Sequence, residues 1–155
     1  MAPSRNILIA LCGTMPGVVS ESAYTLATAE PGFLPHEVIA ITTTAGKEVI
    51  SRDLLASDAW EQLRSILHCD EDHLRFGASD YHIRLIPEAT GASNVSDLDS
   101  SADVRACADY ILRILREYTE NPDTAVVLSI AGGRKTMSVL AALAMTLLGR
   151  TVDRL

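Results

Sequence analysis

The sequence predicts an α/β fold, a Rossmann-like and mostly parallel sheet flanked by helices. The first observation is a set of continuous apolar runs, at 7–12, 38–41 and 124–130, in which hydrophobic and polar residues do not alternate. Such runs are typical of strands buried on both faces. The second is that helix-compatible stretches separate these runs, as expected for parallel strands joined by right-handed crossovers. The third is that turns of small residues follow the strand runs.

In the first half of the chain, we expect a strand at 7–12, a helix at 18–29, a strand at 38–41, helices at 47–55 and 58–68, and a short strand at 81–86. The glycine turn Gly13–Gly17 ends the first strand, and Pro31 with Gly32 ends the first helix. The hydroxyl-rich turn Thr42–Gly46 follows the second strand, and Pro87 ends the third. Trp60 is interpreted as a packing residue.

The second half begins with a polar segment, 88–100, for which an exposed and mobile loop is expected. The clearest helix follows at 101–118, where apolar residues recur at spacings of three and four. A strand is then predicted at 124–130, a turn at 131–136, and a helix that ends at Leu148 before Gly149.

Composition restricts the class of protein. The chain has 155 residues, 13 Lys and Arg against 20 Asp and Glu, and a net charge of −7, which fits one compact domain over 1–155. No apolar run is long enough for a membrane span, and no cleavage-site pattern follows Met1, so a cytoplasmic protein is expected. The acidic balance argues against binding a long nucleic acid, but a small anion in a local basic pocket remains compatible with it.

No metal or cofactor is expected. Cys12, Cys69 and Cys107 lie far apart without a CxxC or Cys/His pairing, so they are expected to be reduced and packed. No cluster of Asp and Glu accompanies the glycine turns, so magnesium chemistry has no support.

The candidate site is formed by three turns. Ligands of open parallel sheets bind beyond the carboxyl ends of the strands. That rule places Gly13–Gly17, Thr42–Gly46 and 131–136 at one edge of the sheet. Neither glycine turn has the spacing of the dinucleotide fingerprint or of a Walker A loop.

The turn before the last helix favours an anion. Gly132 and Gly133 allow close backbone approach, and the helix N-terminus offers free N–H groups and partial positive charge. Arg134 and Lys135 add full charge, and Thr136 could donate a hydrogen bond. The alternative is that the glycines only permit a tight turn and that both cations are solvated.

These two glycine turns carry a family resemblance. The run from Leu11 to Ser22, with Gly-Thr-Met-Pro-Gly at its centre, and the run Ser129–Met137, which contains Gly-Gly-Arg-Lys-Thr, resemble the CRISPR-associated Rossmann fold (CARF) family, in particular its ring nucleases. The resemblance covers essentially the whole chain. The family fold would continue past Leu155 into another strand or an effector, so a truncated or divergent domain is one interpretation of the C-terminus.

The resemblance implies a homodimer that binds a cyclic oligoadenylate, the second messenger of type III CRISPR systems, across its two-fold axis. Some members only sense the ring, whereas others cut it without a metal and leave a 2′,3′-cyclic phosphate. By this resemblance Lys135 would stabilise the phosphorane charge and Arg134 would help to hold a phosphate. The ligand-binding set is then Gly13, Thr14, Met15, Pro16, Thr42, Thr43, Thr44, Gly132, Gly133, Arg134, Lys135 and Thr136.

One residue departs from the family pattern. Members often read Gly-Thr-Ser-Pro in the first turn, where the serine hydroxyl contacts the reacting group, but Met15 stands at that place. The nearest hydroxyl to this position is that of Thr14. Thr14 and Lys135 are therefore the expected catalytic residues. The leading interpretation is a ring nuclease; the alternatives are a binding-only sensor that regulates an effector and a nucleotide-binding protein unrelated to CRISPR.

Overall fold

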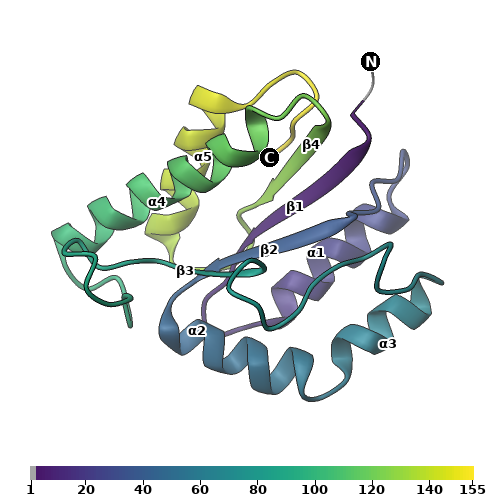
Figure 1. Ribbon diagram of the computed structural model, residues 1–155, viewed down its shortest axis with the longest axis horizontal. Coiled ribbons are helices and arrows are strands. Elements are labelled where there is room, and N and C mark those ends of the chain that lie inside the picture. The colour runs from purple at the N-terminus through teal and green to yellow at the C-terminus, as the bar shows by residue number, and fades with distance from the viewer. Residues whose placement is uncertain (1–2) are drawn as a thin grey trace.

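A parallel sheet with helices on both faces forms the centre of the molecule. The computed structural model describes residues 3–155, so the first two residues of the expected domain lie outside it. The strands are β1 (Arg5–Leu11), β2 (Glu37–Thr42), β3 (Ile83–Leu85) and β4 (Thr124–Ser129), and their order across the sheet is β3-β2-β1-β4 (Figure 1). All three strand pairs are parallel, which confirms the predicted α/β class.

The helices cover the sheet in two groups. Figure 1 shows α4 and α5 on one face and α1 and α3 on the other. The helices are α1 (Gly17–Thr28), α2 (Thr44–Val49), the π-helix η1 (Ile50–Leu55), α3 (Ala59–Ile66), α4 (Ser101–Thr119) and α5 (Lys135–Leu148). α4, predicted from its apolar spacing, begins with a capping box between Ser100 and Asp103, which fixes its N-terminus.

Most predicted bounds differ from the observed ones by one or two residues, and two of the differences have a local cause. The helix expected at 47–55 begins at Thr44, because the Thr43 hydroxyl accepts a hydrogen bond from the Gly46 N–H at 3.3 Å, and it changes to a π-helix after Val49. The strand expected at 81–86 is three residues long. Its first expected residues instead close a turn, in which the His82 N–H donates to the Ser79 carbonyl at 3.0 Å.

Both faces of the sheet are buried, which accounts for strand sequences without alternation. Along β1, Ile7 and Ile9 pack toward α4 and α5, whereas Leu8 and Ala10 pack toward α1 and α3. Trp60 is buried in the second group, with its ring centroid 4.8 Å from that of Phe76, so its predicted packing role is confirmed.

The segment between β3 and α4 is anchored at its middle. The Val95 N–H donates to the Ile86 carbonyl at 2.8 Å, and the Val95 carbonyl accepts from the Thr44 N–H at 3.0 Å. The Val95 side chain is buried in the core. The expectation of an exposed loop at 88–100 is therefore wrong at this point, because one apolar residue among polar neighbours fastens the segment to the residue after β3 and to the first residue of α2.

The last residues pair with the free edge of β4. The Arg154 N–H donates to the Val126 carbonyl at 2.8 Å, and the Arg154 carbonyl accepts from the Leu128 N–H at 2.9 Å. The Asp153 carboxylate is fully buried and accepts from the Val126 N–H and from the backbone and guanidinium of Arg150, at 2.8–2.9 Å. Asp153 thereby fastens this segment to the sheet.

Replacing Asp153 by alanine is expected to lower the free energy of unfolding by about 2–3 kcal/mol, because it removes buried hydrogen bonds to a charged group. Burial raises the pKa of Asp153, but hydrogen bonds from Arg150 and Val126 outweigh that effect and leave the pKa below its usual value. The stabilisation is then complete above the unfolded-state pKa of about 4 and is lost as the pH falls through the lower, folded-state pKa. Urea unfolding at pH 7 and at acid pH tests this, with the exposed Asp123→Ala as control. Equal midpoints for Asp153→Ala and its parent at pH 7 would contradict the assignment.

Candidate functional site

The turns after β1 and β4 lie in backbone contact. A Cβ atom on Gly13 would lie 3.5 Å from the Gly133 Cα, and one on Gly132 would collide with the Leu11 carbonyl oxygen. Gly133 also has a φ of 77°, a conformation that side chains disfavour. Gly132 and Gly133 therefore let the two strand ends approach more closely than larger residues would, whereas a side chain at Gly13 would make an ordinary van der Waals contact.

The first cavity at this edge has a volume of about 400 Å³ and is called the arginine-side cavity. It is lined by five residues of the predicted set, Gly13, Thr14, Thr43, Gly133 and Arg134. Sequence reasoning missed its other polar members, Ser96 and Asp97, which reach it from the anchored segment before α4.

The second cavity has a volume of about 680 Å³ and is called the methionine-side cavity. Its lining includes six predicted residues, Gly13, Thr14, Met15, Pro16, Gly132 and Gly133. Met15 is 79% exposed, so its thioether faces the cavity and solvent instead of the core. The carboxylates of Glu21 and Asp53 also line this cavity, whereas the arginine-side cavity has Asp97 beside a cation.

The N-terminus of α5 has no side-chain cap. Its N-cap residue is Arg134, which makes no capping hydrogen bond. The first N–H groups of a helix have no partner within it, so this 14-residue helix presents donors and partial positive charge beside the glycine turn. The nearby Ser138 hydroxyl donates to the Ile130 carbonyl at 3.1 Å, and it therefore fastens the turn to the helix.

The two cations of this turn differ. The Arg134 guanidinium forms a double hydrogen bond with the Asp97 carboxylate, with Nε to Oδ1 at 2.8 Å and Nη2 to Oδ2 as the second contact. Lys135 and Thr136 are exposed and line neither cavity, and Lys135 forms no ion pair within residues 3–155. Lys135 is thus the uncompensated charge beside α5.

The threonines of the turn that follows β2 form hydrogen bonds within the protein. The Thr42 hydroxyl is buried and donates to the Cys12 carbonyl at 2.7 Å, and the Thr43 hydroxyl caps α2. The backbone N–H of Thr44 is taken by Val95. The exposed Thr14 differs from them, because it borders both cavities and its hydroxyl forms no hydrogen bond within the described part of the chain.

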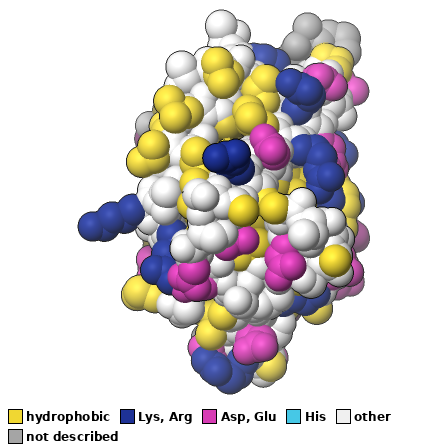
Figure 2. All heavy atoms as spheres, turned by 90° about the vertical axis from the view of Figure 1, so that its left-hand side faces the viewer, with side chains coloured by type: hydrophobic (Ala, Val, Ile, Leu, Met, Phe, Trp, Pro, Cys, Tyr) yellow, Lys and Arg dark blue, Asp and Glu magenta, His cyan; other side chains and the backbone are white. Residues whose placement is uncertain are grey.

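Figure 2 views the side of the molecule that lies at the left of Figure 1, the side toward which the strands run. Basic, acidic and hydrophobic side chains are interspersed there. The site therefore depends on local charges, chiefly Lys135 and the α5 terminus, and not on a continuous basic surface.

Two kinds of chemistry have little support at this edge. Burial raises the pKa of the Cys12 thiol to about 12, so this lining residue is protonated near neutral pH and is a poor nucleophile. Within residues 3–155, no group of three His, Cys, Asp or Glu side chains is placed to hold a metal ion.

No helix in the same range has the length and apolar character of a membrane span.

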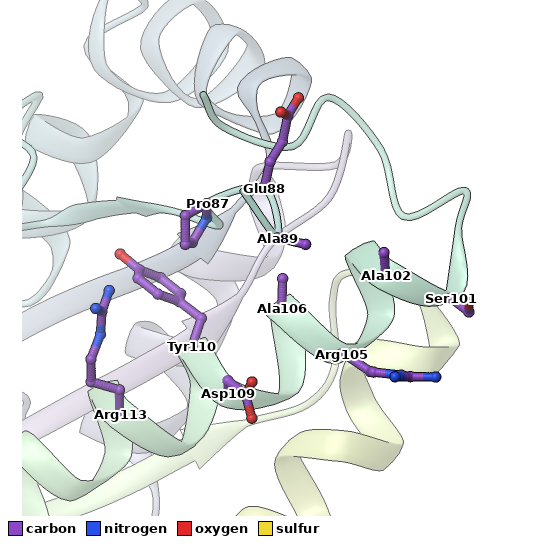
Figure 3. A pocket seen from close by; sticks show the side chains of 10 residues that line it. All are labelled: Pro87, Glu88, Ala89, Ser101, Ala102, Arg105, Ala106, Asp109, Tyr110 and Arg113. Atoms are coloured by element: carbon purple, nitrogen blue, oxygen red, sulfur yellow. The ribbon is translucent and has the colours of Figure 1, made fainter. Parts of the chain in front are cut away.

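A third cavity, of about 500 Å³, lies between residues 87–89 and the first half of α4 (Figure 3). Its charged lining residues are Glu88, Arg105, Asp109 and Arg113, and the Arg113 guanidinium stacks over the Tyr110 ring at 4.8 Å. None of the predicted site residues lies here, so this groove is separate from the strand-end site.

A comparison with known families identifies the chain. The family model of CRISPR-associated protein NE0113 matches residues 15–155, which include every element except β1. The chain belongs to the CRISPR-associated NE0113 family. No curated protein matches it. The interpretation as a nucleotide-binding protein unrelated to CRISPR is therefore wrong, and the site of this NE0113 family member is that of a CRISPR-associated protein.

Proposed function

We propose that this protein binds a cyclic oligoadenylate of type III CRISPR systems and cleaves it without a metal. The observation that carries the proposal is the meeting of three strand-end turns beside the uncapped N-terminus of α5, with Lys135 as its uncompensated cation. Backbone donors, a helix dipole and a cation in one place suit phosphate groups. Membership of the NE0113 family supports a CRISPR substrate.

The proposed reaction needs no cofactor. A ribose 2′-oxygen attacks the adjacent phosphorus, the bond from phosphorus to the 5′-oxygen breaks, and the proton of the 2′-hydroxyl ends on the leaving 5′-oxygen. The products are a 2′,3′-cyclic phosphate and a 5′-hydroxyl. The protein contributes by bending the ring into line and by stabilising the charge of the phosphorane.

Each named residue has one part in the proposed reaction. Lys135 and the N–H groups of α5 stabilise the phosphate oxygens, and the free Thr14 hydroxyl orients the ribose at the border of the two cavities. The carboxylates of Glu21 and Asp53 in the methionine-side cavity repel phosphate but accept hydrogen bonds from amino groups, so adenine bases fit that side better.

A second copy of the chain completes the proposed site. A single chain offers one uncompensated cation, Lys135, whereas a cyclic oligoadenylate carries several negatively charged phosphates. Helix α5 carries an exposed stripe of Val139, Leu143 and Leu147, and no charged residue follows Lys135 within the helix. In a two-fold contact each face meets itself, so an uncharged stripe avoids self-repulsion in a chain of net charge −7. This stripe is the proposed dimer contact.

Leu143→Lys is expected to convert the dimer to a monomer at micromolar concentration, because it places like charges across the two-fold contact. Light scattering measures the change. Ile66→Lys on α3 is the matched control, since Ile66 is 62% exposed against 58% for Leu143. A parent that is monomeric both with and without ligand, or a Leu143→Lys dimer, would count against this contact.

Incubation with cyclic tetra- and hexa-adenylate in EDTA tests the function as a whole. The expected products are linear oligoadenylates that carry a 2′,3′-cyclic phosphate and a 5′-hydroxyl, resolved by chromatography and mass spectrometry. Absence of binding to either ring would refute the proposal.

A binding-only sensor is the second candidate. The exposure of Met15 favours it, because a thioether stands in the methionine-side cavity at the place where ring nucleases often present a serine hydroxyl. In the same incubation a sensor binds the ring and returns it intact.

A further inference from the structure

The Asp97–Arg134 pair is an ion pair inside the candidate site. Its partners are 37 residues apart in the chain, and both line the arginine-side cavity. The carboxylate uses two donors of the guanidinium fork, the geometry in which arginine also binds phosphate. In the protein without ligand, the arginine of the glycine turn is therefore already occupied by an anion.

The chain around Asp97 keeps the carboxylate in this place. Val95, two residues earlier, is fastened by backbone hydrogen bonds to Ile86 and Thr44. Leu98, the residue after Asp97, packs against the core beneath α4 and donates its N–H to the Asp97 Oδ1 at 2.8 Å. The carboxylate is thus presented to Arg134 by an anchored segment, which lowers the entropy cost of forming the pair.

We propose that Asp97 determines the affinity of this site for anions. Its carboxylate occupies Arg134 in the free protein, and a phosphate group must displace it to reach the guanidinium. This inference rests on the proposed function only in placing a phosphate at the glycine turn.

The pair also sets which cation dominates. While Asp97 neutralises Arg134, Lys135 is the main positive charge of the turn. Once a phosphate replaces Asp97, the released carboxylate carries a negative charge close to the ligand. Affinity is therefore lower than two free cations would provide.

Asp97→Asn is the direct test, with inorganic pyrophosphate as the probe in calorimetric titrations at fixed low salt. Asparagine keeps the oxygen that accepts from the Leu98 N–H but removes the charge that competes for Arg134. We expect about tenfold tighter binding than in the parent, which corresponds to about 1.4 kcal/mol. Asp99→Asn is the matched control, since Asp99 is an exposed carboxylate in the same segment and lines neither cavity.

A double-mutant cycle separates competition from a general charge effect. In an Arg134→Ala background, Asp97→Asn should lose most of its effect on affinity, because there is no guanidinium to compete for and only the weaker repulsion of the nearby carboxylate is removed. The proposal is overturned if Asp97→Asn binds pyrophosphate equally or more weakly, if its full gain persists without Arg134, or if neither parent nor variant binds the probe. The proposed function is judged separately, by the ring incubation in EDTA.

Discussion

Lys135→Ala is expected to reduce the rate of ring cleavage by about 10²–10³-fold, the range observed when a donor to a developing oxyanion is removed. The physical reason is the unequal position of the two cations. Arg134 is neutralised by Asp97, whereas Lys135 has no ion pair within residues 3–155 and stands at the first residue of α5. Ring affinity should also fall, by about tenfold or more, since a charge-assisted contact contributes about 1.5–3 kcal/mol. Arg134→Ala should have the smaller effect.

Single-turnover cleavage and equilibrium binding of the same ring, in EDTA and at fixed salt, measure both changes. Lys47→Ala is a matched control, because Lys47, which lies on α2, is the other lysine of the chain and its Nζ forms an ion pair with the Asp80 Oδ1 at 2.8 Å. If Lys135→Ala bound and cut the ring like its parent, the glycine turn before α5 would not be the anion site.

Met15→Ser is expected to raise the single-turnover rate by about fivefold while affinity changes little. A serine hydroxyl at this place contributes a hydrogen bond to the reacting group of about 1 kcal/mol, which the thioether leaves unmade. An interaction formed mainly in the transition state affects the rate and not ground-state binding. The exposure of Met15 in the methionine-side cavity makes the substitution compatible with the fold, since no core contact is lost.

Met15→Ala is the informative control, because it removes the thioether without adding a hydroxyl. Only the serine variant should gain rate. If both variants bind the ring more weakly and cut no faster, Met15 serves as an apolar contact for the bound ring, and the missing hydroxyl is not what limits cleavage.

Much of the fold follows from local sequence patterns. The runs at 7–12 and 124–130 correspond to β1 and β4 because a strand covered on both faces has no reason to alternate. Helix α4 followed from its apolar spacing, and its bounds differ from the prediction by a single residue at the C-terminal end. The convergence of the three turns followed from the rule that parallel strands end at one edge.

The sequence did not predict which of the site residues are free to contact a ligand and which are already bonded within the protein. Thr42, Thr43 and Thr44 were grouped as ligand contacts, but the hydroxyls of Thr42 and Thr43 form internal hydrogen bonds. The Thr42 hydroxyl is taken because the packing of β1 against β2 places the Cys12 carbonyl opposite it, and the Thr43 hydroxyl is taken because it caps α2. The change from α2 to a π-helix has no sequence signal that we recognise.

What the sequence determined by itself is the class of sheet, the order of its elements and the place where glycine turns and cations gather. These depend on periodicity and on residues a few positions apart, which one segment contains in full. What only the tertiary structure decided is the charge of that place. Arg134 and Asp97 belong to separate segments, and Asp97 reaches the site because Val95 is buried beside the end of β2. A pairing of this kind depends on the distance between two side chains in the folded chain, and no local pattern of residues specifies that distance.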